Sequence, residues 1–340
     1  MCIRIEAAFM YKILGALFLC AHLAIGQKPV TIIFDTDIAP DYDDVGAMAL
    51  LHAFADKGEA EILATISCNT FETTVPTLSV LNTYFQRPDL PIGITRAALP
   101  NKKCDQQWAE FINGKYPHKL KSNSEAQEAV QLYRKLLAEQ PDQSVTIVSV
   151  GFFTNLANLL SSVPDEFSPL DGKNLVALKV KQLVSMAASL GKDGKGGHEF
   201  NVVMDAAASR KVFKEWPTPF VLSGFDIGEK IHTGISLIND RKIKNSPVKD
   251  AYEVALRKDK NKVGRNSWDQ TAVLAAVRGL DTYFGYKKMN FEIQEDGRSV
   301  PSEGDRFIYL TLKQKPQELA KVIEELMMHQ PVIKVAENKN

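Results

Sequence analysis

Short apolar runs alternate along this chain with stretches in which apolar residues recur at helical spacing. Strands are predicted for the β-branched, apolar runs at residues 30–34, 61–68, 92–95, 145–150, 182–187 and 220–224. Helices are predicted between them, at residues 44–55, 75–85, 124–138 (opening at a Ser cap), 154–160 and 206–215. Continuous apolar strands that alternate with helices are typical of a parallel sheet buried on both faces. The pattern therefore predicts an α/β fold with a doubly wound, mainly parallel sheet and helices on both faces.

The last third of the chain has a different pattern. Helices are expected at residues 247–257 and 268–278, and a closing amphipathic helix at 316–328 has Pro316 in its first turn. Residues 286–312 alternate as a β-hairpin or small sheet does, with a turn at residues 295–297. Because no repeat or linker divides the chain, residues 27–340 are expected to form a single domain.

Residues 1–26 have the order of parts of a secretory signal peptide. Lys12 precedes an apolar stretch at residues 13–25, and small residues stand at the −3 and −1 positions of Ala24-Ile25-Gly26. We expect cleavage after Gly26, a periplasmic or secreted protein, and no stable membrane span, since the stretch is short. Lipid anchoring at Cys20 is disfavoured because Leu19 stands where a lipoprotein signal has a small residue. The alternative is a buried N-terminal helix.

Composition and charge exclude some classes of partner. The 41 basic and 41 acidic residues cancel, so the whole-protein field does not favour nucleic acid, and a charged ligand must be held by local groups. Hydrophobic residues at 45% and charged residues at 24% are ordinary for a globular core. Beyond the signal, Cys68 and Cys104 form neither a disulfide framework nor a metal-ligand spacing, and whether they pair stays open.

Five carboxylates fall within ten residues where the first predicted strand gives way to the first predicted helix, at Asp35, Asp37, Asp41, Asp43 and Asp44. Asp35 and Asp37 share one face if the strand continues through both. Carboxylates this close repel one another unless protons or a cation intervene. Capping the helix needs one carboxylate rather than five, although it remains an equal alternative for any single one. The cluster predicts a divalent cation site, and calcium tolerates irregular carboxylate geometry better than magnesium does.

Further motifs follow in an order that resembles the inosine–uridine-type nucleoside hydrolases. The segment from Asp35 to Asp44, with the Ala- and Leu-rich stretch after it, resembles their D-x-D-P-G-x-D-D signature. Four later segments resemble other motifs of the family. Residues 63–69 resemble the strand that ends in a sugar-binding Asn, and residues 145–157 resemble the G-P-L-T-N-L-A segment. Residues 199–201 resemble the E-F-N element, and residues 267–272 resemble the helix with the last calcium Asp. The resemblance extends from residue 35 to about residue 278.

The resemblance implies calcium-dependent hydrolysis of the N-glycosidic bond of ribonucleosides, or of a related ribosyl N-glycoside. Ca²⁺ would be bound by Asp37, Asp44, Asp269 and the carbonyl of Thr154, and Asp37 would be the catalytic base that accepts a proton from the attacking water. The small-molecule nucleoside or ribosyl substrate would be held by Asp43, Asn69, Glu199 and Asn201. Because members of this family often form dimers or tetramers, a homo-oligomer stays open.

The chain departs from the family pattern at three places. The loop between Asp37 and Asp43 is longer, which leaves a role for Asp41 open. Trp268 stands where these enzymes often have a His that protonates the leaving base; it is a candidate substrate-binding residue that stacks on the base, or else a core residue. Ala187-Ala188 replaces a paired Gly, and the Asn expected before Glu199 is not evident.

Other interpretations stay open at this point. His198 and His232 are candidate replacement acids, with a surface His of no special role as the alternative. A calcium-dependent sugar- or nucleoside-binding protein with weak or no catalysis is the second hypothesis, favoured by Trp268 in place of the acid. A phosphoryl-transfer enzyme with Asp35 as nucleophile is the third, and it leaves Asp269 without a role.

Overall fold

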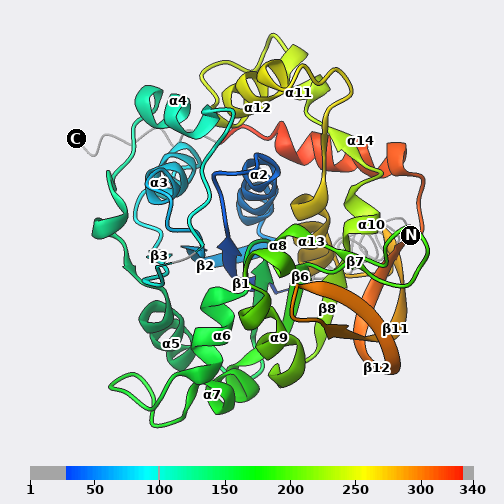
Figure 1. The fold of residues 1–340 in the computed structure, drawn as a ribbon. Coiled ribbons are helices and arrows are strands. Elements are labelled where there is room, and N and C mark those ends of the chain that lie inside the picture. The colour runs from blue at the N-terminus through cyan, green and yellow to red at the C-terminus, as the bar shows by residue number, and fades with distance from the viewer. Residues whose placement is uncertain (1–27, 99, 332–340) are drawn as a thin grey trace, which may run out of the picture.

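The computed structural model describes residues 28–98 and 100–331 and is built around one large sheet (Figure 1). Ten strands form this sheet. Their order is β11 (Phe284–Ile293), β12 (Arg298–Leu312), β8 (Phe220–Ser223), β6 (Val180–Met186), β5 (Val145–Ser149), β1 (Val30–Thr36), β2 (Ala60–Ser67), β3 (Ile92–Ile94) and β4 (Gln127–Glu128), with β7 (Gly197–His198) against β12. The predicted signal peptide lies outside the described residues. Within them, no helix is long and apolar enough to cross a membrane.

The pairing of neighbouring strands is parallel from β12/β8 through to β3/β4. Antiparallel pairing in the described part of this sheet occurs between β11 and β12 and between β12 and β7. The prediction of a doubly wound, mainly parallel sheet is confirmed. The predicted hairpin near the C-terminus is also present, but it is not a separate small sheet, because residues 307–309 pair with residues 220–222 of β8.

Helices cover both faces of the sheet (Figure 1). Neighbouring residues of β1 show the two faces, since Phe34 belongs to one hydrophobic core and Ile33 to the other. The first core includes residues of α2 (Asp43–Asp56), α3 (Thr74–Tyr84), α4 (Trp108–Lys115), α12 (Pro247–Lys258), α13 (Trp268–Arg278) and α14 (Pro316–Met327). The second includes residues of α5 (Ala129–Glu139), α6 (Thr154–Ser161), α7 (Gly172–Lys179) and α9 (Ala206–Glu215).

Several short elements were not predicted from the apolar pattern. They are α4, η1 (Asn123–Glu125), β4, α7, β7, α8 (Phe200–Met204), α10 (Phe225–Gly228), α11 (Ile235–Asn239) and a separate two-stranded sheet of β9 (His232–Thr233) and β10 (Arg265–Asn266). The prediction that a helix begins at Ser124 is wrong. Glu128 pairs with β3 as the end of β4, and its carboxylate accepts a hydrogen bond from the N–H of Gln131, so the helix starts at Ala129.

Candidate active site

The carboxyl end of β1 lies in the middle of the sheet, between β5 and β2, and opens toward a loop that leads into α2. β1 ends at Thr36, so the condition for Asp35 and Asp37 to share a face is not met. Asp35 accepts hydrogen bonds from the Tyr133 hydroxyl at 2.8 Å and the Asn155 amide at 3.0 Å. Only Asp37 of this pair lines the cavity described next, which leaves the nucleophile hypothesis for Asp35 without a site.

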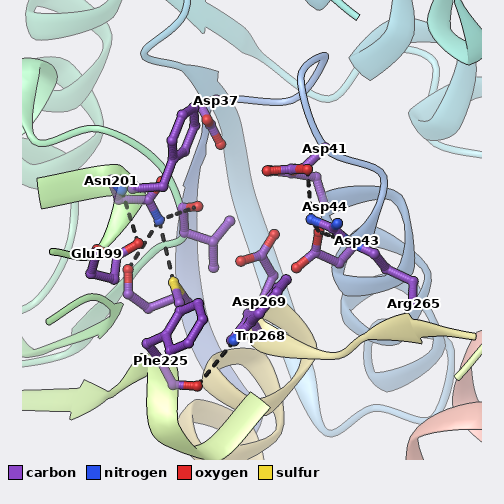
Figure 2. Close-up of a pocket in the computed structure, with 13 residues that line it drawn as sticks. Asp37, Asp41, Asp43, Asp44, Glu199, Asn201, Phe225, Arg265, Trp268 and Asp269 are labelled. Carbon is purple, nitrogen blue, oxygen red and sulfur yellow. Dashed lines mark hydrogen bonds and ion pairs between the residues drawn. The ribbon is translucent and has the colours of Figure 1, made fainter. Parts of the chain in front are cut away.

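A cavity of about 260 Å³ lies at this edge of the sheet (Figure 2). Figure 2 shows Glu199 and Asn201 on one side of it and the carboxylates of α2 and α13 on the other. Six acidic side chains and one arginine are among its lining residues, which are Asp37, Asp41, Asp43, Asp44, Val150, Met186, Glu199, Phe200, Asn201, Phe225, Arg265, Trp268 and Asp269. Most of the residues predicted from the sequence are therefore brought together.

The carboxylates of this cavity fit a hard divalent cation. Asp43, Asp44 and Asp269 are buried, and each offers a carboxylate oxygen within 4.8 Å of the others. One oxygen of Asp44 and one of Asp37, both Oδ2, are buried without a hydrogen-bond partner among the described residues. The other oxygen of Asp44 accepts a hydrogen bond from the Thr36 hydroxyl, which fixes the orientation of the carboxylate. Asp44 belongs both to the group of three and to the acids with an unpartnered oxygen, whereas Asp37 lines the same cavity outside that group. Carboxylate oxygens are the ligands that calcium prefers.

The pKa values of the carboxylates in the cluster also favour a bound cation. Burial raises the pKa of Asp37 well above its usual range, and the charge of Asp44 raises it further. Burial likewise raises the pKa of Asp269, with a second contribution from the charge of Asp43. Each of these groups would hold a proton, or share a cation, rather than stay ionised in isolation.

Glu199 and Asn201 are fixed on the cavity wall at the start of α8. The Glu199 carboxylate accepts hydrogen bonds from the N–H groups of Asn201 at 2.9 Å and Val202 at 3.2 Å. Burial raises the pKa of Glu199 to about 7, although these N–H groups oppose the shift. The Asn201 amide donates to the carbonyl oxygens of Val150 and Met186, both at 3.1 Å, which joins α8 to the ends of β5 and β6.

Asn69 and Thr154 are not among the residues that line the cavity. The Asn69 side chain donates to the carbonyls of Asp37 at 3.0 Å and Lys102 at 2.8 Å, so it holds the backbone beneath Asp37. The Thr154 hydroxyl donates to Asp205 at 2.6 Å. From the segment after β5, it is Val150 that lines the cavity.

Trp268 begins α13 and packs beside Phe225. The Trp268 indole N–H donates to the Phe225 carbonyl at 3.0 Å, and the two rings stack with centroids 5.1 Å apart.

The two histidines considered as acids lie outside the cavity lining: His198 pairs with Asp296 at 3.0 Å on the surface, and His232 is exposed on β9. The described structure holds Cys68 and Cys104 as buried free thiols, not as a disulfide.

Arg265, on β10, is a lining residue that the sequence reasoning missed. Its Nε and Nη2 donate to Asp43 Oδ1 at 3.0 and 2.9 Å, and Nη2 lies 2.6 Å from Asp41 Oδ1. The guanidinium carbon lies 5.0 Å from the Trp268 ring centre. The sequence signal that could have indicated it is the additional acid, Asp41, in the longer loop, since one more carboxylate in an acidic cluster favours a cationic partner nearby.

Comparisons with known proteins find a family match and related sequences. The family model described as inosine-uridine preferring nucleoside hydrolase matches residues 32–330. The pyrimidine-specific ribonucleoside hydrolase RihA of Salmonella agona (strain SL483) is 29% identical over 205 residues, which are 58% of this chain and 61% of the relative. The matched region thus spans less than two thirds of that relative.

Solved structures of low sequence identity share the fold. A purine-preferring ribonucleoside hydrolase from Gardnerella vaginalis superposes with a TM-score of 0.66 at 17% identity, over 88% of this chain and 99% of the other. An inosine-uridine preferring nucleoside hydrolase from Bacillus anthracis gives a TM-score of 0.66 at 15% identity, with the same coverage of both chains.

Proposed function

This chain belongs to the inosine-uridine preferring nucleoside hydrolase family, and we propose that it hydrolyses the N-glycosidic bond of ribonucleosides, or of a related ribosyl N-glycoside, with Ca²⁺ as cofactor. The observation that carries the proposal is the meeting of Asp37 with Asp43, Asp44 and Asp269 in one cavity. Asp37 and Asp44 each have a buried oxygen without a hydrogen-bond partner among the described residues, and Glu199 and Asn201 lie across the cavity from the acids of α2 and α13 (Figure 2).

Asp37 is the proposed catalytic base. Its buried Oδ2 accepts no hydrogen bond from the described residues, so it is free to take a proton from a water molecule. When bound, Ca²⁺ would neutralise the acidic cluster and make nearby water more acidic. The water oxygen then bonds to C1′ of the sugar as the C1′–N bond breaks, and the bonding electron pair leaves with the base.

The groups around the sugar must stabilise the positive charge that develops on it during the reaction. Glycosyl transfer passes through an oxocarbenium-like sugar. Asp43, Glu199 and Asn201 are proposed to hold the sugar hydroxyls in an orientation that favours this charge. Glu199 and Asn201 need no reorganisation, because backbone groups already fix their side chains.

The proposed metal ligands are Asp37, Asp44, Asp269 and one backbone carbonyl from the segment after β5. The family resemblance implies the Thr154 carbonyl; of this segment, it is Val150 that lines the cavity. Asn69 is proposed to act near the sugar, and its bond to the Asp37 carbonyl places it directly behind the catalytic loop.

A calcium-dependent nucleoside-binding protein with weak or no catalysis is the second candidate. The observation that favours it is the lining of the cavity, which includes no histidine to protonate the leaving base.

On the signal-like pattern of residues 1–26 we also propose export to the periplasm or the medium, with residues 27–340 as a single domain.

Reducing-sugar release from a panel of ribonucleosides, with Ca²⁺ and then with excess chelator, tests the proposal. We expect release that depends on Ca²⁺ and that falls by about 10²-fold or more in Asp37→Asn. Asp305→Asn is the matched control, since Asp305 is exposed on β12. Silence across the panel, from a folded protein that nucleosides stabilise against heat, would favour the binding protein.

A further inference from the structure

Two roles are open to Asp43 in the cavity. Its carboxylate offers an oxygen within 4.8 Å of oxygens of Asp44 and Asp269, close enough for all three to hold one cation. The same side chain lines the cavity in which the sugar is proposed to bind. Among the described residues, Asp43 is the member of this group of three that has an ion pair, and its partner is Arg265.

The guanidinium of Arg265 contacts one oxygen of Asp43 twice. Nε and Nη2 donate to Oδ1 at 3.0 and 2.9 Å, whereas no hydrogen bond or ion pair within residues 28–98 and 100–331 uses Oδ2. The side chain of Arg265 is 17% exposed and that of Asp43 is 3% exposed, so water and salt screen the pair little. Two charge-assisted hydrogen bonds to one oxygen therefore fix the orientation of the Asp43 carboxylate.

Arg265 is itself held from several directions. Its backbone pairs with Thr233 in the small sheet of β9 and β10. The guanidinium carbon lies 5.1 Å from the ring centre of Tyr42 and 5.0 Å from that of Trp268, distances at which a cation and an aromatic ring attract. Nη2 also lies 2.6 Å from Asp41 Oδ1 (Figure 2). Arg265 therefore joins the end of the catalytic loop to the start of α13.

We propose that Arg265 is a positioning residue that holds Asp43 in its sugar-binding orientation and keeps it out of the calcium coordination; this rests on the proposed function. An oxygen that already accepts two charge-assisted hydrogen bonds has little capacity left for a cation. The positive charge of the guanidinium also repels a divalent cation that approaches the same carboxylate. A sugar hydroxyl is neutral and can donate to the remaining oxygen, so Arg265 disfavours the ion at Asp43 and not the sugar.

Arg265→Gln tests the inference through two quantities that should change in opposite senses. Without the positive charge, Asp43 can join the calcium ligands, so the Kd for Ca²⁺, measured by isothermal titration calorimetry, should fall by about tenfold or more. Asp43 is then no longer held for the sugar, so kcat/KM for ribonucleosides at saturating Ca²⁺ should also fall by about tenfold or more. A purely structural role would instead weaken calcium binding and activity together.

Two further variants complete the test. Arg265→Lys keeps a positive charge beside Asp43 but loses the planar fork, so it should restore the wild-type Kd for Ca²⁺ and only part of kcat/KM. Asp43→Asn does not require an Arg265 variant to fold. It should lower kcat/KM by about tenfold or more, yet weaken calcium binding much less than Asp44→Asn does, since Asp43 is not a ligand.

Arg257→Gln is the matched control, because Arg257 is exposed on α12 and pairs with Glu253, and it should keep both wild-type values. Calcium binding that is unchanged or weaker in Arg265→Gln would overturn the inference. So would an Asp43→Asn protein that loses as much calcium affinity as Asp44→Asn, or a wild type that binds no Ca²⁺. If the wild type binds Ca²⁺ but cleaves no ribonucleoside, the proposed function fails, while the calcium constants still show whether Arg265 keeps Asp43 from the ion.

Discussion

A Cβ placed on Gly151 would lie 2.4 Å from the backbone nitrogen of Asp37, closer than real side chains approach a backbone. The same atom would lie 2.6 Å from the sulfur of Cys68. Gly151 follows β5 and Asp37 follows β1, so the absence of a side chain lets the two neighbouring strand ends approach each other. The position of the proposed catalytic base therefore depends on a glycine of another strand.

Gly151→Ala should lower both stability and turnover. The added methyl must displace backbone atoms of residues 36 and 37, which typically costs about 1–3 kcal/mol in a packed core. Urea denaturation measures the first effect and nucleoside hydrolysis the second. Gly114→Ala is the matched control, because no atom lies within 4 Å of its added Cβ and alanine favours the helix α4. A Gly151→Ala protein that matches the wild type in both assays would contradict the described contact.

Asp44→Asn should stabilise the calcium-free protein and reduce the stabilisation that calcium provides. Burial and the charge of Asp43 both disfavour an ionised Asp44, so the neutral amide should raise the Tm of the calcium-free protein. The same change removes a proposed ligand. Calcium at about 100 times its Kd should stabilise the wild type by about 2.7 kcal/mol and should stabilise the variant far less.

Thermal unfolding with Ca²⁺ and with excess chelator gives both quantities for Asp44→Asn. Asp305→Asn, on the exposed part of β12, should behave as the wild type does. An equal calcium-induced rise in the Tm of Asp44→Asn and of the wild type would remove Asp44 from the ligand set.

The parts of the site that were predictable from sequence depend on local patterns. Asp37 and Asp44 flank a strand-to-helix junction, which the apolar run of β1 and the helical spacing of α2 predict. Asp269, in the first turn of α13, was identified because residues 267–272 resemble the family helix that carries the last calcium Asp. The position of each of these residues within its own strand or helix does not depend on where that element packs in the fold, so a local pattern is enough to find it.

The parts that were missed depend on contacts between distant segments. Arg265 reaches the cavity because the two-residue strand β10 pairs with β9, and strands that short leave no period to detect. Val150 lines the cavity and Thr154 does not, and the Val150 carbonyl accepts a hydrogen bond from Asn201, which belongs to another segment. Neither contact can be predicted from the spacing of residues along the sequence.

His52 should make the fold sensitive to acid. It is fully buried on α2, its Nε2 lies 3.1 Å from Asn82 Oδ1, and its ring stacks on Phe85. Burial, helped by the charge of Arg87, lowers the pKa of His52 from 6.5 to about 3. Between these values the unfolded chain binds a proton that the folded protein refuses, so stability is lost as pH falls from about 6.5 toward 3.

His52→Gln should therefore flatten the pH dependence of the free energy of unfolding over that window. A single group of this kind contributes up to about 1.4 kcal/mol per pH unit. Urea denaturation at several values between pH 7 and pH 4 measures the slope, which is independent of any constant loss from repacking. His232→Gln, at an exposed position on β9, should leave the slope unchanged. A slope that stays the same in His52→Gln would show that other groups cause the acid sensitivity.

Ala188 adopts a left-handed conformation, with φ of 69°, at a position where the family pattern has glycine. This turn after β6 aims the Ala188 N–H at Glu199 and its carbonyl at the N–H of Phe225, at 2.9 Å. The left-handed conformation costs a residue with a Cβ about 1–2 kcal/mol. Ala188→Gly relieves that cost, but it also removes a buried methyl, worth about 0.8 kcal/mol, and increases the entropy of the unfolded chain, which costs about 0.4–1 kcal/mol. The protein should therefore be about as stable as the wild type.

Ala187→Gly provides the contrast for this last prediction. Ala187 is equally buried and has an ordinary negative φ, so its change to glycine relieves no strain. It loses a packed methyl and adds backbone freedom to the unfolded chain, which should lower stability by about 1 kcal/mol or more. Urea denaturation of the two variants side by side separates backbone strain from packing. Equal losses in both would mean that Ala188 is not strained, and that the turn beneath Glu199 is held by packing alone.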